Sequence, residues 1–146
     1  MNKGVILTLV FTLICLLKPL KINSQDDELF SGCLSSFRSP FIVTERSFRA
    51  LLTGNEVAEF RATFFSGTVY RIVSCGYESD IIEFTVYDSS RKVLFSSKEH
   101  ENAEIWDFLM EGSIECVIEA KLIPGKATSG MVFMLLGFRS SMPDAV

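Results

Sequence analysis

The sequence has few of the residues from which catalytic and metal sites are usually built. It contains a single histidine, His100, and four cysteines, and no Cys/His cluster has the spacing of a zinc site. Nothing near His100 in the sequence suggests an activated nucleophile, so a Cys–His or Ser–His pair is not indicated. No acidic segment has the spacing of a calcium-binding loop. The sequence therefore predicts no enzyme, no cofactor and no metal ion.

The alternative is a calcium site built from carboxylate side chains. Glu99, Glu101 and Glu104 lie in and beside the polar loop around His100, and residues 26–28 form a second acidic group. Oxygen ligands of this kind suit Ca²⁺ in exported proteins. Scattered carboxylates on an acidic domain are more commonly a solvated surface, and we prefer this interpretation.

Basic residues are also few, with 14 Lys and Arg against 18 Asp and Glu. Three of the basic residues, Lys3, Lys18 and Lys21, precede Gln25, so the chain from Gln25 onward has a net charge of 11 − 18 = −7. Nucleic acids and anionic membrane surfaces bind clusters of Lys and Arg. Neither is therefore predicted as a partner, whereas a protein or a glycan remains open.

The only long hydrophobic run lies at the N-terminus. Residues 1–3 supply a positive charge, Gly4 to Leu17 is almost unbroken apolar sequence, and Ser24 is a small residue before Gln25. This is the layout of a secretory signal peptide, and the run is shorter than the roughly 20 residues that span a membrane. We predict cleavage near Ser24, a secreted or periplasmic protein, and no stable membrane insertion after cleavage. The alternatives are a lipid on Cys15 and an uncleaved anchor.

Helical periodicity is absent as well, since no long segment carries an apolar pattern of about 3.6 residues. Apolar and polar residues instead alternate along successive short segments, as in Ala58, Phe60, Ala62 and Phe64 and again in Ile82, Phe84 and Val86. Alternation with period two indicates strands with one buried face. About eight such strands, with turn signals roughly every 8–12 residues, predict an all-β fold: an antiparallel, jelly-roll-like β-sandwich.

The predicted organisation has four parts: a signal peptide at 1–24, an N-terminal arm at 25–46, a β-sandwich domain at 47–139 and a mobile tail at 140–146. The first predicted strand of the sandwich is Ser47 to Leu52. The last, Met131 to Phe138, is almost entirely apolar. That composition is typical of a central strand covered on both faces.

Three cysteines remain after residue 24: Cys33, Cys75 and Cys116. An oxidising compartment favours a disulfide, and the odd count leaves one thiol over. Three single bridges are possible. We predict Cys75–Cys116, because Cys116 shares the inward parity of Ile114 and Ile118 and because Cys75 ends a strand. Cys33–Cys116 is the second choice, and three buried, unreactive thiols are the alternative.

Three aromatic residues, Phe65, Tyr77 and Tyr87, fall at or next to strand ends on the parity opposite to the predicted core. Aromatic side chains on a β-sandwich can stack on sugar rings or anchor a protein partner. They are therefore the candidate ligand-stacking residues. The alternative is that the N-terminal arm covers this face with its apolar residues Phe37, Phe41 and Ile42.

Five segments carry a resemblance to known proteins: AEFRATFFSGTVYRIVSC, IIEFTVYDSSRKVLF, IWDF, CVIEAKL and MLLGF. They resemble a group of small exported bacterial proteins of unknown function, and the resemblance covers about Phe48 to Phe138. The strand order, and the hairpin with VYD before its turn and VLF after it, also resemble the GOLD and pre-peptidase C-terminal β-sandwich domains. This resemblance implies a non-catalytic accessory or binding domain and supplies no catalytic residues.

These patterns predict an exported, non-catalytic protein-interaction or envelope accessory module that uses a sheet edge or an aromatic patch. The alternative is a carbohydrate-binding module, in which Phe65, Tyr77 and Tyr87 would cluster on one exposed, flat face. A second alternative is a small hydrolase. It would require a deep cleft that joins His100 to a cysteine or to two carboxylates.

Overall fold

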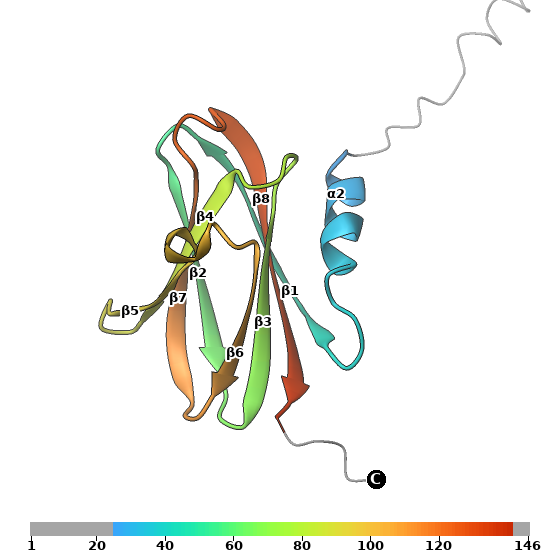
Figure 1. Cartoon of the computed structure of the whole chain (residues 1–146), viewed down its shortest axis with the longest axis vertical. Coiled ribbons are helices and arrows are strands. Elements are labelled where there is room, and N and C mark those ends of the chain that lie inside the picture. The colour runs from blue at the N-terminus through green and yellow to red at the C-terminus, as the bar shows by residue number, and fades with distance from the viewer. Residues whose placement is uncertain (1–24, 142–146) are drawn as a thin grey trace, which may run out of the picture.

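Two antiparallel sheets of four strands each form the body of the protein, seen in a computed structural model that describes residues 25–141 (Figure 1). In sheet A the strands lie in the order β1 (Ile42–Thr53), β8 (Ser129–Ser140), β3 (Thr68–Cys75) and β6 (Ile105–Met110). In sheet B the order is β2 (Val57–Phe64), β7 (Ile114–Leu122), β4 (Ile82–Asp88) and β5 (Val93–Ser96). The prediction of an antiparallel β-sandwich with about eight strands is confirmed.

Within the described residues, the helices are α2 (Gln25–Leu34) and the 3₁₀ helix η1 (Ser97–His100). Acidic residues 26–28 occupy the first turn of α2, where negative charge interacts favourably with the helix dipole. Neither helix is long and apolar enough to cross a membrane. The predicted signal peptide at 1–24 and residues 142–146 of the predicted tail lie outside the described part of the chain.

Strand β1 begins earlier than the sequence predicts. It starts at Ile42 rather than at Ser47, so the end of the predicted N-terminal arm already pairs with β8. The register of that pairing shifts between Val43 and Ser47. An irregularity of this kind interrupts the period-two alternation from which a strand is recognised in a sequence. The sequence therefore predicts a separate strand from Ser47, with Phe41 to Val43 as either a short strand or an extended arm.

The main core lies between the inner faces of the two sheets. Alternate residues of the strands point into it, and six of its apolar side chains have a relative exposure of 0%: Ile72, Phe84, Ile118, Ala120, Val132 and Met134. Each large apolar side chain that is fully buried stabilises the fold by roughly 1.5–3 kcal/mol. Packing of the two inner faces is therefore the main source of stability.

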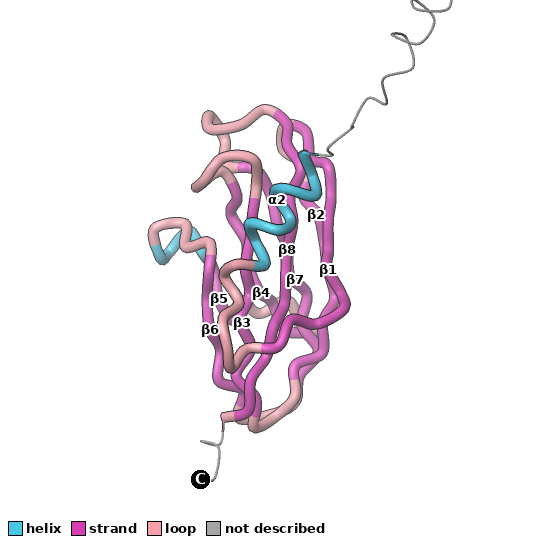
Figure 2. The backbone as a smooth tube through the Cα atoms, turned by 90° about the vertical axis from the view of Figure 1, so that its right-hand side faces the viewer, coloured by secondary structure: helices cyan, strands magenta, loops and turns pink. Residues whose placement is uncertain are grey.

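Strand β8 is buried on both faces, as its apolar sequence predicts. Its second face carries Phe133 and Leu135, which are 3% and 1% exposed and belong to a smaller apolar cluster. Helix α2 lies over β3 and β8 on the outer face of sheet A (Figure 2) and contributes Leu29 and Phe30 to this cluster. The N-terminal segment thus covers the outer face of sheet A.

One arginine fixes the segment that follows α2. Arg71 of β3 donates two hydrogen bonds to the carboxylate of Asp107 on β6, at 2.7 and 2.9 Å. Its guanidinium also donates to the carbonyl of Ser36 (2.9 Å) and lies 4.1 Å from the ring centroid of Phe41. The hydrogen bonds to Asp107 raise the pKa of Arg71. A cation shared between a carboxylate, a carbonyl and a ring holds this segment against sheet A.

The disulfide joins Cys33 of α2 to Cys75 at the end of β3, with 6.1 Å between the two Cα atoms. The predicted Cys75–Cys116 bridge is wrong, and so is the second choice, Cys33–Cys116, because Cys116 is a free, buried thiol. Cys116 faces the main core from sheet B, whereas Cys75 belongs to the cluster outside sheet A. The sequence correctly predicts that the side chain of Cys116 points inward. Alternation alone, however, does not indicate which of the two apolar clusters a cysteine joins.

We expect alkylation of the unfolded, unreduced protein from Gln25 onward to label Cys116 alone and peptide mapping to recover linked Cys33 and Cys75 peptides. Replacing Cys33 and Cys75 with serine should lower the free energy of unfolding by roughly 2–4 kcal/mol, because the bridge restricts the unfolded chain across a separation of 42 residues. Urea unfolding measures the change. Cys116→Ala is the control that leaves the bridge intact, and a linked Cys75–Cys116 peptide would contradict the assignment.

A second prediction concerns Gly137 of β8. A Cβ atom at this position would lie 2.5 Å from the ring of Phe37, so Gly137→Ala forces the ring or the strand to move. Overpacking of this kind is expected to lower the free energy of unfolding by about 1–3 kcal/mol. Gly112→Ala is the matched control, because no atom lies within 4 Å of its Cβ position. Equal urea midpoints for the two variants would contradict the placement of Phe37.

Candidate functional site

Among residues 25–141, strand β2 is an edge strand that pairs on one side only, with β7. The N–H of Ile123, which follows β7, donates to the carbonyl of Ile81 before β4 at 2.8 Å. Backbone groups alternate sides along an antiparallel strand, so the odd-numbered residues of β7 bond to β4 and the even-numbered ones bond to β2. In β2 itself, the N–H and C=O groups of Glu59, Arg61 and Thr63 therefore point to the open side.

A polar hollow of about 280 Å³ lies on the outer side of this edge, where Arg61 and Thr63 of β2 face Ser89 and Arg91 of the β4–β5 turn. We call it the outer hollow; Glu115 of β7 also lines it. Arg91 forms ion pairs with Glu59 and Glu119, and its hydrogen bond lowers the pKa of Glu59.

The two arginines of the outer hollow differ in their surroundings. Both acceptors of Arg91 are carboxylates already within the sheet, on β2 and β7. Arg61 is exposed and makes no ion pair with any residue from 25 to 141. The positive charge of Arg61 is consequently the one that remains available to a ligand in this hollow.

An apolar hollow of about 310 Å³ lies on the other side of the same edge, and we call it the inner hollow. Its apolar wall consists of Phe48, Phe64, Phe65, Tyr70 and Leu136. Residues of β1 and of the last part of β2 line this hollow together. Arg61 and Thr63 border this hollow as well as the outer one.

Phe65 stands at the rim of the inner hollow. Its side chain is 59% exposed, while its N–H donates to the hydroxyl of Tyr70 at 3.1 Å. The backbone of Phe65 is therefore held while its ring stays accessible. An exposed aromatic ring beside an apolar hollow is a common anchor for a protein partner.

The three predicted stacking residues do not come together. Phe65 follows β2 at one end of the sandwich, and Tyr77 lies after β3 at the opposite end (Figure 1). The hydroxyl of Tyr77 donates to the carboxylate of Asp26 on α2, and this hydrogen bond raises the pKa of Tyr77. Tyr87 lies on β4 with the Arg91 guanidinium 5.6 Å from its ring centroid. They form no single flat face.

The single histidine belongs to an aromatic cluster at the opposite edge of the sandwich. The ring centroid of His100 lies 5.1 Å from that of Phe95 and 4.3 Å from that of Trp106. Within residues 25–141, no three His, Cys, Asp or Glu residues are placed so that they could hold a metal ion. His100 is thus an exposed residue whose ring contacts two aromatic rings, and it lines neither the outer nor the inner hollow.

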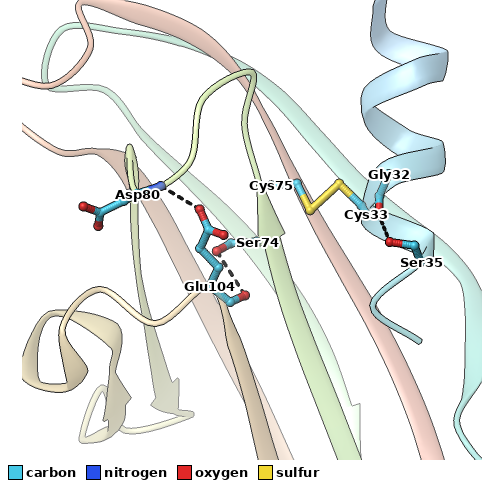
Figure 3. Close-up of a disulfide and its surroundings, with 7 residues drawn as sticks. All are labelled: Gly32, Cys33, Ser35, Ser74, Cys75, Asp80 and Glu104. Carbon is cyan, nitrogen blue, oxygen red and sulfur yellow. Dashed lines mark hydrogen bonds between the residues drawn. A yellow bond between two sulfur atoms is a disulfide. The ribbon is translucent and has the colours of Figure 1, made fainter. Parts of the chain in front are cut away.

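A larger hollow, of about 490 Å³, lies between α2 and the β3–β4 loop beside the disulfide. In Figure 3 the side chain of Glu104 points at the β3–β4 loop, where it accepts a hydrogen bond from the N–H of Asp80 at 2.6 Å. The N–H of Ser74 donates to the Glu104 carbonyl at 2.8 Å. These bonds fix the loop, and the lining holds neither a histidine nor a free thiol.

Sequence reasoning missed Arg61 and both hollows at the β2 edge. Alternation correctly placed Arg61 on the outer side of its strand, but nothing local indicates that β2 ends a sheet. Strand order is a long-range property, because β7, the strand with which β2 pairs in the described part of the chain, lies at least fifty residues later. Of the predicted stacking residues, Phe65 alone borders one of the two hollows.

Comparison with solved structures shows the class of fold. The chain is similar to the crystal structure of Aeromonas hydrophila PliG, a periplasmic lysozyme inhibitor of g-type lysozyme, with a TM-score of 0.52 and 9% identity over 70% of this chain and 91% of that chain. No family model matches, and no curated protein matches. At this identity the likeness concerns the fold alone. The resemblance to GOLD and pre-peptidase C-terminal domains stays a prediction.

Cys116 provides a further prediction, because it lines the outer hollow although it is only 2% exposed. Burial, with a smaller effect of the Asp88 charge, raises the pKa of its thiol to about 11. The reactive thiolate is then rare at pH 8, so iodoacetamide should label the native protein far more slowly than the urea-unfolded protein. Mass spectrometry over time measures both rates. Equally fast labelling of the folded protein would show that the thiol is accessible.

Proposed function

We propose that the protein is a non-catalytic protein-binding module that acts outside the cytoplasm. The observation that carries the proposal is the open β2 edge, which lies between a polar hollow and an apolar one. Two further observations support it: the shared fold with PliG, a periplasmic inhibitor protein, and the disulfide, which is typical of an oxidising compartment.

The two alternative functions have less support. A carbohydrate-binding platform requires Phe65, Tyr77 and Tyr87 on one face, and the fold separates them. A hydrolase requires a base beside a nucleophile, but the exposed ring of His100 contacts the rings of Phe95 and Trp106. A sheet edge demands neither arrangement. It recognises protein through backbone hydrogen bonds, and this is the feature that the described residues offer.

The class of partner that we propose to test first is a lysozyme, since PliG inhibits a g-type lysozyme. The protein from Gln25 onward, with its disulfide formed, should bind a purified g-type lysozyme with a dissociation constant of about 1 μM or below. It should also slow peptidoglycan hydrolysis in proportion to the bound fraction. Calorimetry and a turbidity assay measure the two effects.

The control for this experiment is the heat-unfolded, reduced protein at the same concentration, which retains the charge but not the fold. Binding without inhibition would support a protein-binding module and reject the inhibitor role. Neither binding nor inhibition with g-type, c-type and i-type lysozymes would reject lysozyme as the partner class.

A further inference from the structure

We infer that β2 binds an extended segment of the partner protein as an added strand, and that this segment alternates apolar and acidic side chains. The inference rests on the proposed protein-binding function and specifies its surface and its ligand chemistry. It is carried by three features of one strand: the open backbone groups, the opposite character of the two hollows, and the unpaired charge of Arg61.

The backbone of β2 supplies the first part of the argument. Its residues Glu59, Arg61 and Thr63 present N–H and C=O groups at every second position of an eight-residue strand. A partner strand placed about 4.8 Å away would satisfy these groups. Such strand addition provides affinity through main-chain hydrogen bonds, while the pockets for alternate side chains provide specificity.

The two hollows supply the second part. Side chains of an added strand would point alternately to the two faces of sheet B. Those on the inner side would enter the hollow between Phe48, Phe64 and Phe65, where apolar groups are favoured. Those on the outer side would meet Arg61 and Thr63. The edge therefore selects a segment in which apolar residues alternate with polar ones.

The charge of Arg61 supplies the third part. Arg91 is already paired with Glu59 and Glu119, whereas Arg61 makes no ion pair within residues 25–141. A carboxylate on the outer face of the partner strand could form a bidentate pair with the Arg61 guanidinium. Glu115 pairs in register with Thr63, and its negative charge would repel a carboxylate beside Thr63. The acidic side chain of the partner strand is therefore expected opposite Arg61.

The other edge strands are less suited to this role. Strand β5 has only four residues, and β1 changes register between Val43 and Ser47. The outward carboxylate of β6, Asp107, is already bound to Arg71, and no residue of β6 lines either hollow. Among the four edges, β2 combines length, regularity and hollows on both sides.

The experiment uses the oxidised protein from Gln25 onward and three short synthetic peptides in which valine alternates with glutamate, with lysine or with serine. NMR titration follows the backbone amides, and hydrogen exchange measures their protection. The glutamate peptide should bind most tightly and protect the amides of Glu59, Arg61 and Thr63. No binding of any peptide at about 1 mM, or protection confined to another edge, would overturn the inference.

Three variants locate the contact. Arg61→Glu should weaken binding of the glutamate peptide by about 10-fold or more and favour the lysine peptide. Thr63→Pro should abolish binding, because it removes an outward N–H that the fold itself does not use. Arg49→Glu, the same charge change on β1, should leave binding unchanged. Urea midpoints verify that each variant is folded. If Thr63→Pro does not fold, the Arg61→Glu variant and the hydrogen-exchange data still test whether the peptide binds at β2.

The variants also separate this inference from the proposed function. If lysozyme binds the wild type and all three variants equally, the protein-binding function stands and strand addition at β2 is overturned. If the peptides respond as expected and lysozyme does not bind, the edge is supported and the partner class is rejected. If light scattering shows a dimer that Arg61→Glu dissociates, the occupant of the edge is a second copy of this chain, and the inferred partner segment is rejected.

Discussion

Contact between the inner faces of the two sheets is the interaction on which the rest of the structure depends. Residues such as Ile72 and Met134 of sheet A and Phe84 and Ile118 of sheet B are fully excluded from water there. Because this contact uses one side of every strand, each sheet retains an outer face and two edges. The helix, the disulfide and the ion pairs described above determine which of these faces and edges are covered and which stay exposed.

The two sheets solve this problem differently. The outer face of sheet A is apolar at Val73, Phe133 and Leu135, and it is covered by α2, which the disulfide fastens to β3. The outer face of sheet B instead carries charged side chains that are compatible with contact with water. Arg91 forms ion pairs there, and Lys121 pairs with Glu83. Sheet A is thus closed by its own chain, and sheet B stays accessible as far as the edge of β2.

How much of this could be predicted follows from the range of each signal. Period-two alternation is local, so the strands, the sandwich and the doubly buried β8 were predicted from the sequence. The Cys33–Cys75 bridge and the separation of Tyr77 from Phe65 depend on which sheet and which end a residue occupies. Those are properties of strand order, which one sequence does not reveal. For the same reason the sequence does not reveal that Arg61 lies on an edge strand.

An open edge also carries a risk of aggregation, because exposed strands of different molecules can pair with one another. Proteins commonly protect edges with charged residues, and Glu59 and Arg61 do place charges along β2. Protection alone, however, does not explain a hollow between Phe48 and Phe65 on the core side of the strand. Charged side chains disfavour pairing with most strands, whereas an apolar hollow favours a strand with apolar side chains at matching positions. This combination is expected of a selective binding edge.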